Sequence, residues 1–348
     1  MSASFSNKLI DWYNQNKRDL PWRKTKNPYK IWVSEIILQQ TRIEFGTKYY
    51  NRFLKKYPNV RKLANSSDRD LMKIWEGLGY YSRAINMLKT AKIILNSYNG
   101  VFPSKYDQLI QLPGIGDYTA SAISSICDNE LQPVVDGNVL RFLSRMHKID
   151  LPIESIKTKR YFKKLGLRLI QDVNPGDFNQ ALMDYGSTIC KPKKFDCNNC
   201  LFSSDCKAFN SNSVENYPVK KKKIKVKDRF LNYVVVVTND NKTQIKKRDS
   251  SGIWKNLYEF PLIEGKHSNL SQIVNKKEFN VLTNKMKKPP RFLQVIDVKH
   301  ILTHQILKIK FWIFDSEGCL NNSLSINEII DLPKPVVISD FINKHLKS

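Results

Sequence analysis

The chain has no hydrophobic run long enough to cross a membrane. No apolar stretch in its 348 residues reaches the roughly 18 residues that a spanning helix needs. The N-terminal segment carries the charged residues Asp11 and Lys17 close to Trp12, whereas a secretory signal has an uninterrupted apolar core. The sequence therefore predicts a soluble, cytoplasmic protein with no membrane partner.

Acidic residues are scarce relative to basic ones. The chain has 32 Asp and Glu against 58 Lys and Arg, a formal net charge of +26, and both halves of the chain are basic. This excess favours a polyanionic partner, because Lys and Arg gain affinity by displacing counterions from phosphates. Nucleic acid is the first candidate and an anionic membrane the second. The alternative is that biased codon usage explains much of the lysine content.

Cysteine is also scarce, and its distribution is uneven. Four of the six cysteines follow the spacing C-x6-C-x2-C-x5-C within one short stretch. Structural zinc sites usually combine two separated pairs with two-residue spacing, and only one such pair occurs here. The spacing therefore favours an iron-sulfur cluster over zinc or free thiols, and its role is expected to be structural. The four residues are Cys190, Cys197, Cys200 and Cys206.

The apolar pattern divides the chain into two regions. From Phe5 to about Phe209, apolar residues recur every three or four positions, which predicts an all-α region. Residues 211–229 contain the lysine run 220–223 and little that could pack, so we expect a linker that is either solvated or in contact with phosphates. No internal repeat is evident.

Beyond the linker, the period becomes that of β-strands. Leu231–Thr238 is rich in valine, Gln244–Arg248 alternates, and Ile306–Phe314 is apolar and aromatic. The sequence therefore predicts a separate α/β domain over residues 230–348.

The segment around residue 115 predicts two helices joined by a tight turn. We expect Ser104 to cap a helix that runs to Leu112, and a second helix over Tyr118–Ile126. Between them, Gly114 and Gly116 permit a backbone that presents free N–H groups at a helix N-terminus, where a phosphate is favoured. An ordinary turn between helices is the alternative.

Glu35 is an acid on an apolar helical stripe. Its neighbours at offsets of three and four residues are apolar, so desolvation should disfavour its charged form and raise its pKa. A general acid at neutral pH requires such a shift. The alternative is a buried Glu paired with Arg23 or Arg42. The apolar neighbours are Ile31, Trp32 and Leu38.

Asp136 precedes the helical segment Asn138–His147, so it is most simply interpreted as a helix N-cap. A second role is compatible with this one. Breaking a bond between a base and deoxyribose builds positive charge on the sugar, and a second carboxylate could stabilise that charge.

Longer segments resemble one known family. The chain looks like an adenine DNA glycosylase of the MutY type, within the endonuclease III superfamily, over nearly its whole length. The resemblance implies a [4Fe-4S] cluster held by the four cysteines, a helical domain of residues 1–26 and 134–210, and a six-helix domain of residues 27–133 that carries the helix-hairpin-helix. The matching segments are Leu20–Arg23, Val33–Thr41, Gly77–Arg83, Leu112–Ala120, Val135–Val139 and Phe178–Ala181.

The resemblance also implies roles for individual residues. Glu35 would protonate adenine at N7, and Asp136 would stabilise or trap the sugar cation, with Tyr118 and Asn138 in support. Gln40 and Tyr80 would wedge into the duplex near the oxidised guanine. The adenine pocket would comprise Trp22, Arg23, Leu38 and Gln180, and further DNA contacts would come from Thr41, Gly114 and Gly116.

Tyr118 bears on the rival activity. A bifunctional glycosylase such as endonuclease III attacks with a lysine at this position and then nicks the strand through a Schiff base. A phenol cannot form an imine, so we expect a monofunctional enzyme. The expected partner is double-stranded DNA with adenine opposite 8-oxoguanine or guanine, bound by a monomer. A noncatalytic iron-sulfur DNA-binding protein is the other alternative.

Residues 230–348 resemble the Nudix-like domain with which these enzymes inspect the guanine, notably in Ser251–Pro261. The chain has no Gly-x5-Glu-x7-Arg-Glu motif to hold magnesium, so we expect a binding module. Recognition of 8-oxoguanine would fall to Leu302, Thr303 and His304, where the family commonly has Phe-Ser-His. Leu302 lacks the aromatic ring and Thr303 keeps the hydroxyl, while an ordinary strand-end histidine is the alternative for His304.

Overall fold

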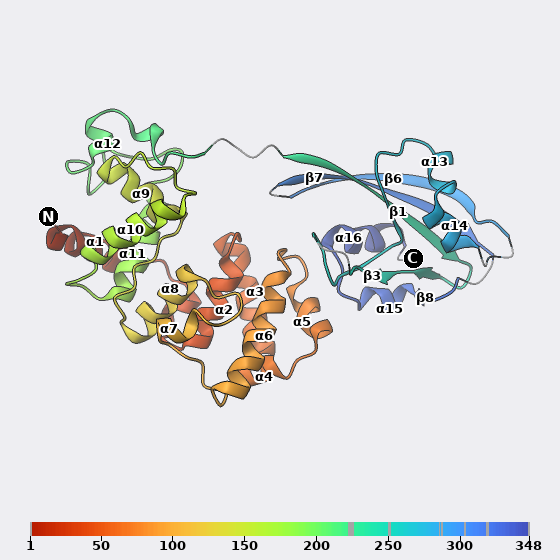
Figure 1. Ribbon diagram of the computed structural model, residues 1–348, viewed down its shortest axis with the longest axis horizontal. Helices are drawn as coiled ribbons and strands as arrows, with labels where there is room; N and C mark the ends of the chain where they lie inside the picture. The colour runs from red at the N-terminus through yellow and green to blue at the C-terminus, as the bar shows by residue number, and fades with distance from the viewer. Residues whose placement is uncertain are drawn as a thin grey trace. The chain divides into compact units, whose positions relative to one another are not determined.

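The computed structural model describes residues 2–221, 226–249, 252–284, 286, 288–302, 304–317 and 320–346. These residues form two compact units (Figure 1). Unit 1 comprises Met1–Ser66 and Ile85–Lys223, and unit 2 comprises Ser67–Ala84 and Ile224–Ser348. Among the described residues, no helix has the length and apolar character needed to span a bilayer.

Unit 1 is built from helices, as predicted for the first region of the chain, and its described residues include no strand. Its longer helices are α1 (Ser2–Asn16), α2 (Pro28–Leu38), α3 (Ile43–Lys56), α6 (Ser82–Ser97), α8 (Asp117–Asp128), α9 (Gly137–His147), α10 (Ile156–Leu169) and α11 (Pro175–Thr188). The short ones are η1 (Pro21–Lys24), α4 (Val60–Ala64), α7 (Tyr106–Leu109), α12 (Lys207–Asn210) and η2 (Val214–Asn216).

Within unit 1, helix α11 packs against α1, α8 and α9. Its buried residues Phe178 and Tyr185 join Phe142 of α9 in one apolar core. Gly186 lets α9 approach closely, because a Cβ at this position would lie 2.7 Å from the carbonyl oxygen of Asn138. This packing fixes the N-terminal end of α9, where Asp136 and Asn138 lie.

Unit 2 contains a six-stranded mixed sheet with the order β6-β7-β1-β2-β8, and β5 pairs with β1. Strands β1 and β7 are parallel, whereas the other pairings are antiparallel. The strands are β1 (Lys227–Thr238), β2 (Lys242–Gln244), β5 (Leu262–Glu264), β6 (Arg291–Ile301), β7 (Gln305–Ser316) and β8 (Ser323–Ser325). A separate two-stranded ladder joins β3 (Lys246–Lys247) to β4 (Tyr258–Glu259).

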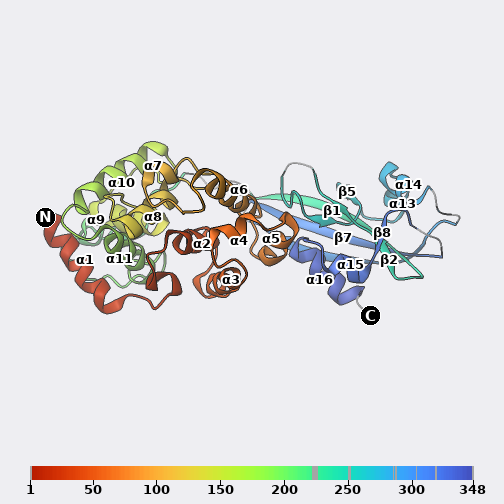
Figure 2. The ribbon, with the colours of Figure 1, turned by 90° about the horizontal axis from the view of Figure 1, so that it is seen from below.

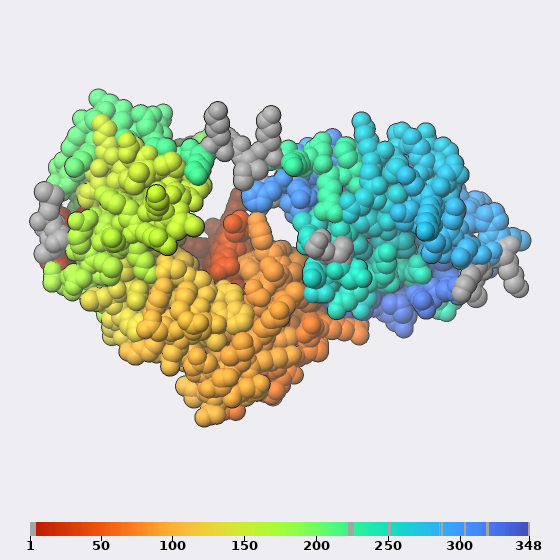
Figure 3. Space-filling view, in the orientation of Figure 1, coloured from red at the N-terminus to blue at the C-terminus, as the bar shows by residue number. Residues whose placement is uncertain are grey.

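Helices pack on both faces of the sheet, which explains the continuous valine run of β1. Tyr233 and Val235 face the core formed with α15 (Ile326–Ile330) and α16 (Val336–His345). The intervening residues Val234 and Val236 face the side of α13 and α14. Figure 2 shows these two helix pairs on opposite sides of the sheet, and Figure 3 shows α13 and α14 at the surface of unit 2. The bounds are Ser271–Val274 for α13 and Lys277–Thr283 for α14.

The segment Ser67–Ala84 belongs to unit 2 although it precedes most of that unit by 140 residues in the sequence. Its helix α5 (Asp68–Trp75) carries Lys73, which forms an ion pair with Asp331. The hydroxyl of Ser339 in α16 donates a hydrogen bond to Glu76. The predicted boundaries of the two helical domains, at residues 27 and 133, stay a prediction.

Candidate active site

Helix α2 places a single carboxyl group in apolar surroundings. Asn27 caps the helix by accepting a hydrogen bond from the backbone N–H of Lys30 at 3.2 Å, and Pro28 occupies the first turn. Most of the helix is buried, but Glu35 is partly exposed. Burial raises the pKa of Glu35 to about 7, against an ordinary value of 4.5. A substantial fraction of its carboxyl group is therefore protonated near neutral pH.

Asp136 lies at the N-terminus of α9 and accepts two hydrogen bonds. Its carboxylate accepts from the backbone N–H of Val139 at 2.7 Å, which confirms the predicted N-cap, and from the Asn138 amide at 2.8 Å. Burial raises the pKa of Asp136, and these hydrogen bonds partly offset that shift. Asn138 is fixed in turn by Arg141, whose guanidinium donates to the side-chain amide oxygen of Asn138 at 3.0 Å.

Tyr118 completes a cluster with the two carboxyl groups. The charge of Asp136 raises the pKa of Glu35, and a hydrogen bond with the Tyr118 hydroxyl lowers it. Burial and both carboxylates raise the pKa of Tyr118 far above its ordinary value, so its phenol stays neutral. The hydroxyl oxygen also lies 3.3 Å from the sulfur of Met183. Helices α2, α8 and α9 thus bring together three of the predicted catalytic residues.

The turn before α8 has the geometry expected of a helix-hairpin-helix. Gly114 adopts a φ of +78°, and a Cβ there would lie 2.7 Å from the Cβ of Asn86. Gly116 is the N-cap residue of α8, and no side chain caps that helix. Its first N–H groups are therefore available to an anion. The first helix differs from the prediction, because α7 ends at Leu109 and its N-cap is Lys105 instead of Ser104.

The four residues assigned to the adenine pocket have well-defined packing. Trp22 is 7% exposed and packs edge-on against Tyr50. Leu38 lies against Gly46, and Gln180 donates to the carbonyl oxygen of Gly176 at 3.2 Å within α11.

The fourth residue, Arg23, pairs with an acid other than Glu35. Its guanidinium binds both oxygens of Asp184 at 2.5 and 2.7 Å, and Arg18 binds the same carboxylate. Asp184 was not among the predicted site residues. Its signal in the sequence is slight, namely one acid within an otherwise apolar turn of α11.

Two residues assigned to DNA wedging share an unusual backbone conformation. Gln40 has a φ of +58° and Tyr80 a φ of +48°, in the left-handed region that few residues other than glycine adopt. Both side chains are exposed, and Tyr80 is 48% accessible. Such strain is concentrated at binding and catalytic sites in proteins. Thr41, between Gln40 and α3, donates through its backbone N–H to Leu38 at 3.1 Å.

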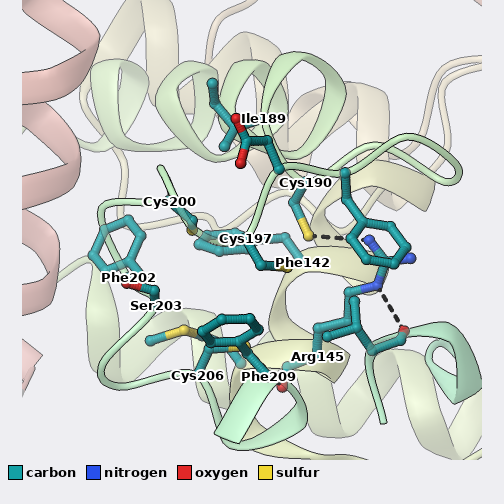
Figure 4. A pocket seen from close by; sticks show the side chains of 14 residues that line it. Phe142, Arg145, Ile189, Cys190, Cys197, Cys200, Phe202, Ser203, Cys206 and Phe209 are labelled. Atoms are coloured by element: carbon teal, nitrogen blue, oxygen red, sulfur yellow. Dashed lines mark hydrogen bonds between the residues drawn. The ribbon is translucent and has the colours of Figure 1, made fainter. Parts of the chain in front are cut away.

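The four cysteines surround one hollow, as Figure 4 shows. Arg145 is 3% exposed and donates to the sulfur of Cys190 at 3.3 Å, so a positive charge faces the sulfur cluster. The hydroxyl of Tyr185 lies 3.1 Å from the sulfur of Cys200. Within the described residues, no three His, Cys, Asp or Glu side chains are gathered as a single metal ion requires. The aromatic lining consists of Phe142, Phe195, Phe202 and Phe209.

Two of the residues assigned to 8-oxoguanine, Leu302 and His304, lie between β6 and β7. Leu302 is partly buried against the core of unit 2, and its N–H donates to the carbonyl oxygen of Gln305 at 2.8 Å. The His304 side chain is exposed, and its carbonyl oxygen accepts from the N–H of Lys227 at 3.3 Å. Thr303 lies outside the described residues, and so does Ser251, the first residue of the matching segment Ser251–Pro261.

Comparison with known proteins identifies both regions of the chain. Residues 33–167 match the HhH-GPD superfamily of base excision DNA repair proteins, and residues 232–344 match the NUDIX domain. A solved structure of a thermostable thymine-DNA glycosylase is similar to this chain with a TM-score of 0.56 and 27% identity. That similarity covers 60% of this chain and 97% of the other.

Full-length relatives are also similar. The chain is 35% identical to an adenine DNA glycosylase of Buchnera aphidicola subsp. Baizongia pistaciae (strain Bp), over 95% of this chain and 94% of the relative. It is 38% identical to an adenine DNA glycosylase of Buchnera aphidicola subsp. Acyrthosiphon pisum (strain APS), over 78% of each chain. The chain therefore belongs to the adenine DNA glycosylase family, and it is a base-excision repair DNA glycosylase of the endonuclease III superfamily.

Proposed function

We propose that this glycosylase hydrolyses the bond between adenine and deoxyribose where adenine lies opposite 8-oxoguanine or guanine in duplex DNA. The observation that carries this proposal is Glu35, a carboxyl group with a pKa near 7 beside Asp136 and Tyr118. A neutral carboxyl group can donate a proton to a base, whereas a fully ionised one cannot. The family relatives named adenine DNA glycosylase support adenine as the base removed.

In this mechanism, protonated Glu35 donates its proton to N7 of the extruded adenine. The bond between adenine N9 and the sugar then breaks, its electron pair leaves with the base, and the sugar becomes an oxocarbenium-like cation. The Asp136 carboxylate, oriented by Asn138 and the N-terminus of α9, stabilises that cation. Water then adds to the sugar and loses a proton, so the product is an abasic site in an intact strand.

The four cysteines fit a [4Fe-4S] cluster better than zinc. They line one hollow with aromatic walls, and Arg145 would offset the negative charge of the ligands. Their spacing in the sequence disfavours zinc, because structural zinc sites usually combine two separated pairs with two-residue spacing and only one such pair occurs here. Cys190, Cys197, Cys200 and Cys206 would hold the cluster. When bound, it would supply a cross-link that shapes the loop for contact with the DNA backbone.

Recognition of the partner base is assigned to unit 2. We propose that Leu302, Thr303 and His304 contact 8-oxoguanine, and that Trp22, Arg23, Leu38 and Gln180 receive the adenine. The remaining DNA contacts would come from Gln40, Thr41, Tyr80, Gly114 and Gly116. We further propose that the enzyme acts as a monomer in the cytoplasm.

The reaction product tests this function directly. The full chain is incubated in single-turnover conditions with duplexes that contain adenine opposite 8-oxoguanine, guanine or thymine, with and without borohydride. We expect free adenine from the first two duplexes and strand breaks only after alkali. Efficient strand cleavage trapped by borohydride would instead show a lyase that uses a Schiff base, and binding without release of adenine would show a noncatalytic protein.

A further inference from the structure

A buried acid on α11 pairs with Arg23, one of the residues assigned to the adenine pocket. The side chain of Asp184 is 1% exposed, and a buried carboxylate must be paired to remain charged. Its two partners come from the N-terminal segment of unit 1. Arg23 binds it through two hydrogen bonds of 2.5 and 2.7 Å, and Arg18 binds one of its oxygens. The network therefore contains two positive charges and one negative charge.

Arg23 connects this network to Glu35. Its side chain is 10% exposed and lies 5.5 Å from the ring centroid of Tyr13. The positive charge of Arg23 acts on Glu35 and favours its ionised form. Low exposure limits screening by water, so a change in the net charge of the network should reach Glu35.

The other groups that act on Glu35 come from two further helices. They are Tyr118 of α8 and Asp136 of α9. Helix α3 also packs against α2, and burial raises the pKa of its Tyr50 to about 12, so that phenol is neutral. Arg23, on η1, is therefore the positively charged group that acts on Glu35 among these elements.

We propose that Asp184 is a positioning residue, which holds Arg23 in place and partly neutralises the positive charge that acts on Glu35. This inference rests on the proposed function. The ion pairs of Asp184 are with Arg23 and Arg18, so it would act on Glu35 through Arg23.

Two substitutions should have opposite effects. Asp184→Asn raises the net charge of the network from +1 to +2, which favours ionised Glu35. The alkaline limb of the pH–rate profile should then move to lower pH by about half to one unit. Arg18→Gln lowers the network charge to zero and leaves the pair of Asp184 with Arg23 intact. It should move the limb to higher pH by a similar amount.

The test measures single-turnover rates of adenine release from pH 5 to 9 on a duplex with adenine opposite 8-oxoguanine. Asp177→Asn is the matched control, since it makes the same change of charge about two turns earlier on α11, where the side chain is exposed. The alkaline limb of the pH–rate profile of Asp177→Asn should coincide with that of the unmodified enzyme. The double variant Asp184→Asn with Arg18→Gln restores a charge of +1, so its limb should return toward the original pH.

A purely structural role predicts a different outcome, in which Asp184→Asn lowers the rate equally at every pH and Arg18→Gln leaves the limb unchanged. That result would overturn the proposal. Should Asp184→Asn fail to fold, Arg18→Gln still decides the question, because Arg18 is 31% exposed and its loss buries no unpaired acid. An unmodified enzyme that releases no adenine at any pH would instead contradict the proposed function.

Discussion

At the scale of single residues, the chemistry depends on opposing effects at Glu35. Loss of water around the carboxyl group raises its pKa, and this effect is the largest. The Tyr118 hydroxyl and the Arg23 charge act in the opposite direction, and the Asp136 charge reinforces burial. The net result, a pKa of about 7, keeps a useful fraction of the acid form in a site that also contains an ionised acid.

The first prediction concerns the pH profile of the unmodified enzyme. Since Glu35 must be protonated, the single-turnover rate should fall as pH rises through about 7. Since Asp136 must be ionised, the rate should also fall at acid pH, at a value above the ordinary pKa of Asp because burial raises it. Rates measured across this range should form a bell. A rate that rises steadily from pH 6 to 9 would contradict these assignments.

The candidate acids could be predicted from the sequence, but the buried partner of Arg23 could not. Glu35 stands out because a carboxyl group on an apolar stripe is costly to bury unless it is paired, so its presence there marks a candidate functional residue. The pair of Arg23 with Asp184 joins residues 161 positions apart, and no local pattern reveals such a contact. The sequence is therefore compatible with a pairing of Glu35 with Arg23. In the structure, Arg23 pairs with Asp184 instead.

At the scale of elements, the turn before α8 depends on a glycine in one position more than in the other. Gly114 has a positive φ and lies against Asn86, whereas Gly116 has a φ of −95° and open space where a Cβ would be. The hairpin thus requires glycine at residue 114 for its backbone. At residue 116, glycine leaves room for a ligand above the helix N-terminus.

The second prediction compares alanine at these two positions. Gly114→Ala should destabilise the fold by at least about 1–2 kcal/mol, because an L-residue is strained in the left-handed region, and should also weaken binding to duplex DNA. Gly116→Ala should change stability by less than about 1 kcal/mol. Urea unfolding and DNA titration of both variants measure these effects. Equal stability of the two variants would contradict the assigned role of Gly114.

The third prediction concerns the cysteine loop. Protein purified without oxygen should contain about four iron and four sulfide ions per chain, as a [4Fe-4S] cluster requires. Cys200→Ser should lose most of this iron and unfold at a lower temperature. The matched control is Cys127→Ser on α8, which lies outside the loop and should keep its iron. Stoichiometric zinc in place of iron would contradict the cluster assignment.

Some elements were harder to predict than others, for physical reasons. The valine run of β1 identified a strand because both of its faces are buried. Strand β6 was not predicted, since its residues are mostly exposed or half-buried and Asp297 and Lys299 interrupt the apolar ones. The expected helix to Leu112 was too long, because the chain leaves α7 at Leu109 to enter the hairpin.

At the scale of the whole molecule, the net charge of +26 is consistent with a DNA-binding enzyme. The fourth prediction is that binding to a duplex weakens strongly with salt. If six to ten phosphates are neutralised, affinity should fall by about 10³- to 10⁵-fold between 50 and 200 mM salt. Mispaired and matched duplexes should show similar slopes, since phosphate contacts carry no sequence information. A salt-independent affinity would show that the basic excess has another origin.

The central claim, that Glu35 supplies the proton for release of adenine, is tested most directly by Glu35→Gln. The variant should fold at least as stably as the unmodified enzyme at pH 8, because burial of the ionised carboxylate destabilises the fold there. Adenine release from a duplex with adenine opposite 8-oxoguanine should fall by about 10²- to 10⁴-fold in single-turnover conditions. Affinity for that duplex should stay within a few fold. A variant that binds normally and retains most of its activity would contradict the account.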